Sequence, residues 1–123
     1  MKQKVHSVSY LAKAEFEFKN GVYDLVALPT GAEVVKVSLE VVGNLTNSTN
    51  STTNNISVGF KDETTKNYFL TLEGNNNNAT SAKDYTATSN KVIVAEVKNA
   101  IKTDAKGVLR VLYFLPSVIE VEY

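Results

Sequence analysis

The stretch from residue 32 to residue 42, AEVVKVSLEVV, alternates apolar and polar side chains with a period of two residues. The apolar positions from residue 35 onward are Val35, Val37, Leu39 and Val41, and the polar positions between them are Lys36, Ser38 and Glu40. In a β-strand, successive side chains point to opposite faces of the sheet. The pattern therefore predicts a strand with one buried face and one face in water.

Most of the other patterned segments repeat this two-residue period, and none follows the helical period. The segments expected to be extended are residues 3–12, 14–19, 22–28, 56–60, 68–72, 85–88, 91–98, 108–115 and 117–123. We predict an all-β fold in which eight to ten short strands form a two-sheet antiparallel sandwich of jelly-roll or Greek-key type. A closed barrel is the alternative. The 123 residues suit one domain, with residues 1–12 as an extended N-terminal arm and residues 13–123 as the β-sandwich.

Turn residues and polar tracts divide these segments. Asn20-Gly21 is typical of a two-residue hairpin turn, and predicts that residues 14–19 pair with residues 22–28. The asparagine-rich tracts at residues 44–55 and 74–81 contain too few apolar side chains to form a core, so we expect two exposed loops. Residues 99–106 are the only candidate for a short helical turn.

Charge and composition argue against several classes of partner. The chain carries thirteen basic and thirteen acidic side chains, with no basic stripe, so we expect no direct contact with nucleic acid. No stretch approaches the ~20 apolar residues that span a bilayer, and no signal peptide is visible, so no membrane partner is expected. The chain has no cysteine, which excludes disulfides and thiolate metal sites.

The sequence contains no arrangement of residues that predicts catalysis. His6 is the only histidine, and it lies in the N-terminal arm rather than in a strand of the sandwich. Asp62, Glu63 and Asp84 supply carboxylates for calcium, but the spacing of a calcium loop is missing, so they are expected to be solvated turn residues. Five Asn-x-Ser/Thr triplets follow from the composition of the polar tracts. We predict a protein that is not an enzyme, with no cofactor, no metal and no small-molecule substrate.

Aromatic side chains recur at strand spacing and have two interpretations. They form either a surface on which sugars stack or part of the core and subunit interfaces, and the second is the more common role of such residues. The residues concerned are Tyr10, Tyr68, Phe69, Tyr85, Tyr113 and Phe114.

Three segments together resemble a known family. They are residues 23–41, YDLVALPTGAEVVKVSLEV, residues 56–60, ISVGF, and residues 107–113, GVLRVLY. They are similar to the small β-sandwich virion proteins of tailed bacteriophages, in which a strand, an L-P-x-G-A turn and a valine-rich strand precede a variable loop and a V-G strand. Within that group, the chain resembles the decoration or cement proteins that bind the outside of a capsid.

This resemblance implies a structural role on the outer capsid surface of a virion, after synthesis in the host cytoplasm. Cement proteins of this kind tie neighbouring capsomers together, so the resemblance implies a homotrimer bound to the major capsid protein. An extended arm is suited to adding a strand to a neighbouring sheet. The interface candidates are Val5, His6, Val8, Tyr10, Leu11, Val92, Val94, Val108, Arg110, Leu112 and Phe114. The alternatives are a carbohydrate- or receptor-binding module of fibre or adhesin type, and a structural subunit of a tail or baseplate.

Overall fold

The computed structural model describes residues 1–43, 55–73, 76–100 and 105–122. These residues form eleven strands and no helix. The described part of the chain therefore contains no helix that could span a membrane. The strands are β1 (Lys2–His6), β2 (Ser9–Glu17), β3 (Gly21–Leu28), β4 (Glu33–Val42), β5 (Asn55–Phe60), β6 (Leu70–Glu73), β7 (Asn78–Ser81), β8 (Tyr85–Thr86), β9 (Lys91–Lys98), β10 (Lys106–Phe114) and β11 (Val118–Glu122). The prediction of an all-β fold is confirmed.

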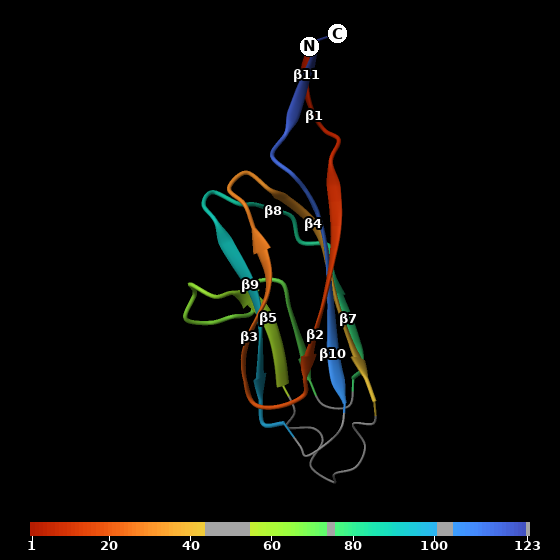
Figure 1. Ribbon diagram of the computed structural model, residues 1–123, viewed down its shortest axis with the longest axis vertical. Coiled ribbons are helices and arrows are strands. Elements are labelled where there is room, and N and C mark those ends of the chain that lie inside the picture. Colours follow the sequence, from red (N-terminus) through yellow and green to blue (C-terminus); the bar gives the residue numbers. More distant parts are fainter. Residues whose placement is uncertain (44–54, 74–75, 101–104, 123) are drawn as a thin grey trace.

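The strands form three antiparallel sheets, rather than the predicted two. One sheet has the order β2-β10-β4-β7, with the short β8 also paired to β4, and the second has the order β3-β9-β5-β6. A third sheet consists of β1 and β11 alone, and we call it the terminal ribbon. Figure 1 shows the two larger sheets as two layers, with the terminal ribbon projecting from one end and carrying both chain termini. Neither large sheet closes on itself.

The hydrophobic core lies between the two large sheets and receives side chains from both. Its fully buried members include Val34, Val37, Leu39, Leu109 and Val111 from one sheet and Ile56, Val58, Phe60, Ile93 and Val97 from the other. Burial of one such side chain contributes about 1.5–3 kcal/mol. β10 is an interior strand of its sheet, since it pairs with both β2 and β4.

The hairpin predicted at Asn20-Gly21 is wrong. β2 pairs with β10 and β3 pairs with β9, so the turn carries the chain from one sheet to the other. Phe18 is buried within this turn and its backbone amide donates to the carbonyl of Ala105. The Asn20 side chain accepts a hydrogen bond from the Ala100 amide. The residues of this turn suit a hairpin within one sheet as well as a crossing between the two sheets. The burial of Phe18 favours the crossing.

The strict alternation predicted for β4 fails at one position. Val34 is fully buried, whereas Val35, which was expected on the buried face, is 36% exposed. The register against β10 shifts between Leu112 and Tyr113, so β4 carries an extra residue there. A bulge of this kind reverses the face to which the residues on one side of it point.

The second polar tract is also different from the prediction. Residues 78–81, expected in a loop, form β7 and pair with β4 at the edge of the five-stranded sheet. Ala79 packs against the core while its neighbours remain polar, which suits an edge strand. Residues 44–54 and 101–104, where most of the first loop and the helical turn were predicted, lie outside the described residues.

Candidate interaction surface

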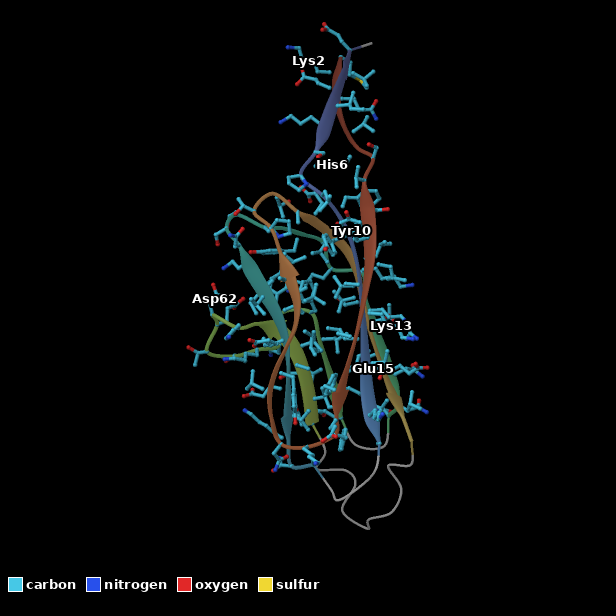
Figure 2. All side chains as sticks on the ribbon, in the orientation of Figure 1. Lys2, His6, Tyr10, Lys13, Glu15 and Asp62 are labelled. Atoms are coloured by element: carbon cyan, nitrogen blue, oxygen red, sulfur yellow. The ribbon has the colours of Figure 1, made fainter. Side chains whose placement is uncertain are left out.

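The outer face of the five-stranded sheet consists of alternate residues of β2, β10 and β4. Directly opposed residues of antiparallel strands point to the same face. The rows across the sheet are Glu15, Val108 and Glu40; Lys13, Arg110 and Ser38; Leu11, Leu112 and Lys36; and Ser9, Phe114 and Glu33. Figure 2 shows the Lys13 and Glu15 side chains pointing away from the body of the protein. This face is therefore a broad surface in which both signs of charge alternate with apolar side chains.

One ion pair crosses this outer face. The Arg110 guanidinium lies 3.3 Å from a carboxylate oxygen of Glu40 on the neighbouring strand. Exposed pairs of this kind contribute at most about 1 kcal/mol to folding. The charges on this face therefore add little to the stability of the chain, and they are accessible to a binding partner.

Exposed apolar side chains gather at the end of this face nearest the terminal ribbon. Leu11 is 62% exposed there, and Val8 and Val35 are also exposed. A shallow hollow of about 350 Å³ opens beside them, lined by His6, Glu33, Val35 and Phe114. Clustered exposed apolar side chains of this kind mark interaction sites in soluble proteins more often than isolated ones do.

The terminal ribbon has two chemically different faces. In its register, Lys2 is opposite Glu122 and Lys4 is opposite Glu120, so one face carries opposite charges on its two strands. The Lys2 ammonium lies 3.8 Å from the Glu120 carboxylate. The other face carries Gln3, Val5, Ile119 and Val121. Ile119 on this second face is 59% exposed.

His6 lies at the junction between the terminal ribbon and the sandwich (Figure 2). Its Nδ1 is 3.0 Å from the backbone carbonyl oxygen of Leu115, and next to it the Leu115 amide donates to the Val8 carbonyl. This contact orients the imidazole toward the backbone of the C-terminal segment. The role that the geometry supports for His6 is the fixing of the ribbon base.

The carboxylates considered for calcium are engaged elsewhere or are not gathered. The Asp62 carboxylate accepts a hydrogen bond from the Lys91 ammonium at 2.6 Å, which holds the pKa of Asp62 below its ordinary value and raises the pKa of Lys91. Among the described residues, no group of three or more His, Cys, Asp or Glu side chains is placed to hold a metal ion.

Most of the aromatic side chains pack against one another. Phe60 contacts Tyr68, Phe69 and Tyr85 with ring centroids 4.5–5.3 Å apart, in tilted arrangements. Tyr10 and Tyr113 form an edge-to-face pair at 6.0 Å. Such geometry is typical of packed aromatic clusters. The described residues thus show aromatic rings used in packing rather than aligned as a flat platform for sugars.

Two of the interface candidates are buried by the chain itself. Val94, which was predicted as an interface residue, is 0% exposed, and Val108 is also buried. Val94 is opposite Gly59 in the sheet, and the backbone of residues 66–68 passes so close to Gly59 that a Cβ there would lie 2.7–2.8 Å from it. The loop between β5 and β6 therefore covers the outer face of the four-stranded sheet at this point.

The other candidates are accessible to differing degrees. Val8, Tyr10 and Leu11 are exposed, and the half-buried ones are Val5, His6, Val92, Arg110, Leu112 and Phe114. Except for Val92, these residues lie on β1, β2 or β10, or, in the case of Val8, between β1 and β2. The sequence analysis missed Val35 and Ile119. The alternation of Ile119 and Val121 with Glu120 and Glu122 was a signal that could have identified Ile119.

Chains in two solved capsid structures are among those similar to this chain. A chain in the acid-stable capsid structure of Helicobacter pylori bacteriophage KHP30 is 73% identical, with a TM-score of 0.89 and full coverage of both chains. A chain in the capsid asymmetric unit of cyanophage Pam1 is 22% identical and has a TM-score of 0.69, with 88% of this chain and 85% of that chain covered, and it shows the same fold. No protein-family model matches the sequence, and no curated protein matches it significantly.

Proposed function

We propose a mechanical role for this chain, which belongs to the same family of bacteriophage capsid proteins as its counterpart in the KHP30 particle. In this proposal the protein is a cement or decoration protein on the outer surface of the capsid. It is made in the host cytoplasm, forms a homotrimer, binds the major capsid protein and holds neighbouring capsomers together. It is not an enzyme, and it needs no cofactor and no small-molecule substrate.

The strand order supports a jelly-roll sandwich for the body. The sheets β2-β10-β4-β7 and β3-β9-β5-β6 each place β10 or β9, from the end of the chain, between two strands from earlier in it. Eight strands in two such sheets match the jelly roll, which recurs in viral capsid domains. We propose residues 13–123 as the domain that contains this sandwich together with β11 of the terminal ribbon, and residues 1–12 as its arm, in which β2 already begins at Ser9.

The observation that carries the proposal is the continuous surface on one side of the molecule. The charged outer face of the five-stranded sheet leads into the apolar end around Leu11 and Val35, and from there into the terminal ribbon. A clamp needs a long surface with many contacts rather than a deep pocket. Several copies that bind such a surface together gain strength through effective concentration.

Binding to assembled shells tests this role. Shells that lack this protein are mixed with the purified chain, and co-sedimentation and the temperature of shell disruption are measured. We expect saturable binding and a higher disruption temperature. The double variant Leu11→Asp with Lys13→Glu changes the outer face, and we expect it to bind at least tenfold more weakly, which is about 1.4 kcal/mol.

A matched control replaces an apolar residue by Asp and a lysine by Glu elsewhere on the surface. Val22→Asp with Lys98→Glu alters an exposed valine and an exposed lysine of the four-stranded sheet, and this variant should bind like the wild type. Failure of the wild-type chain to bind these shells would reject the proposed role. Equal weakening in both double variants would reject the assignment of the outer face.

A further inference from the structure

The terminal ribbon has two strand edges that no other described strand pairs with. β1 and β11 pair with each other over five residues and form a sheet of their own. An isolated two-stranded ribbon is at best marginally stable in water, and its outer edges present unpaired backbone N–H and C=O groups. A ribbon of this kind gains stability when further strands pair with its edges.

The two edges carry opposite charges. β1 contributes Lys2 and Lys4, and β11 contributes Glu120 and Glu122, all on one face of the ribbon. The side chains of Lys2 and Glu120 are more than half exposed, so they remain accessible to a further strand. If β1 paired with β1 of a second copy, lysines would face lysines, and pairing of β11 with β11 would oppose glutamates. Only pairing of β1 with β11 is complementary in charge.

We propose that the terminal ribbon is the assembly element of the protein, in which β1 of one copy pairs with β11 of the next copy. This pairing is head to tail, so a rotation that closes produces a ring. All copies of β1 run in one direction around such a rotation axis and all copies of β11 run in the other. The contact between copies is therefore antiparallel, as is the contact within each ribbon.

The apolar face of the ribbon supports a closed ring. With the charged face outward, Val5, Ile119 and Val121 of every copy point toward the axis, where they exclude water. Small closed sheets are filled by inward-pointing side chains in this way. The inference deepens the proposed cement role and rests on it only for the number of copies, which is three. The pairing of β1 with β11 follows from the ribbon itself.

A charge swap tests the pairing between copies without breaking the ribbon. The variant Lys2→Glu, Lys4→Glu, Glu120→Lys and Glu122→Lys keeps opposite charges within each ribbon and between identical copies. When this variant is co-expressed with wild-type chain that carries a mass tag, like charges meet wherever the two pair. We expect native mass spectrometry to show two separate homo-oligomers of the same size, with mixed oligomers at least tenfold below binomial proportions.

A second swap serves as the matched control. Glu17→Lys with Lys19→Glu exchanges a surface ion pair, 2.9 Å apart, at the turn that follows β2. This variant should mix freely with the wild type. Free mixing by the four-fold ribbon swap would overturn the proposed pairing, and so would wild-type chain that stays monomeric. If freely mixing or monomeric chains still bind shells, the cement role stands and the ring is rejected. If wild type and variant form separate oligomers that do not bind shells, the ring stands and the cement role is rejected.

Cross-linking gives a readout that does not depend on charge. The chain contains no cysteine, so one Lys4→Cys copy and one Glu120→Cys copy can form only the disulfide that is designed between them or homodimers. Head-to-tail pairing places these residues on adjacent strands of different copies. In a ring, two Lys4 positions are separated by an intervening β11, about 10 Å apart. We expect the mixed disulfide to predominate, and a preference for homodimers would contradict the proposal.

Discussion

Gly107 on β10 lies directly opposite Phe16 on β2, and the Phe16 ring covers the place that a side chain at Gly107 would occupy. The ring is buried and stacks on Tyr23 of β3, with centroids 5.5 Å apart. Three strands from two sheets thus meet around one ring. The absence of a Cβ at position 107 is what lets the ring pack against β10.

Gly107→Ala is expected to destabilise the protein. A methyl group at this site collides with the Phe16 ring, and overpacking of a filled core costs about 1–3 kcal/mol. The free energy of unfolding, measured in urea, should fall by that amount. In the background of Phe16→Ala, which removes the ring, the added cost of Gly107→Ala should shrink to within ~0.5 kcal/mol of zero. An unchanged cost in both backgrounds would contradict the assigned contact.

The bulge in β4 predicts unequal effects for two neighbouring valines. Val34 is fully buried and Val35 is 36% exposed. We expect Val34→Ala to lower the free energy of unfolding by about 2–3 kcal/mol, because it leaves a cavity. Val35→Ala should stay within about 0.5 kcal/mol of the wild type. A regular strand would bury Val35 and expose Val34, so the Val35→Ala change would then cost more than the Val34→Ala change. Measuring the free energy of unfolding of both variants therefore decides whether the bulge is present.

The loop over the four-stranded sheet predicts that Val94 stabilises the isolated chain. Val94→Ala should cost about 1–3 kcal/mol in the absence of any partner, because the side chain is already covered. Val92→Ala, at a half-buried site on the same face of the same strand, should cost less. Denaturation at concentrations low enough to suppress association provides the measurement. Equal small costs would mean that Val94 is covered only by another subunit.

The ion pair between Asp62 and Lys91 predicts a small pH dependence of stability. The hydrogen bond from Lys91 lowers the pKa of Asp62, so the folded state favours the carboxylate more than the unfolded state does. The contribution of the Asp62 carboxylate to stability is present above its pKa in the unfolded state, about 3.9. It is lost as the pH falls through the lower pKa that Asp62 has in the folded state. The pKa of Lys91 is raised, so the stabilisation that the charged Lys91 gives the folded state is present below about pH 10. This stabilisation is lost as the pH rises further.

The measurement is a series of thermal melts of the wild type and of Asp62→Asn. The variant should melt at a slightly lower temperature between about pH 5 and pH 9, and the difference should narrow below about pH 3, where the carboxylate is protonated. Asp24→Asn, which removes the more exposed Lys61 pair at 2.7 Å, serves as the comparison. A difference for Asp62→Asn that grows in acid would reverse the assigned sign.

Residue order alone determined the type of secondary structure and much of its location. The two-residue period around Lys36 and Glu40 predicted β4, and the pattern of residues 91–98 predicted β9 with the bounds that the structure has. The extended segment predicted at residues 22–28 ends where β3 ends, directly before Pro29. These features depend on side-chain alternation and on backbone restrictions within a few residues, so they are visible in the sequence itself.

Only the tertiary structure decided which strands are neighbours and which side chains are covered. Asn20-Gly21 satisfies a turn equally well within one sheet or between two, and the burial of Phe18 selects the second. Val94 is hidden by a loop that is distant from it in the sequence, and β1 pairs with β11 at the opposite end of the chain. Such contacts depend on packing summed over the whole molecule, and a local pattern of residues does not contain that sum.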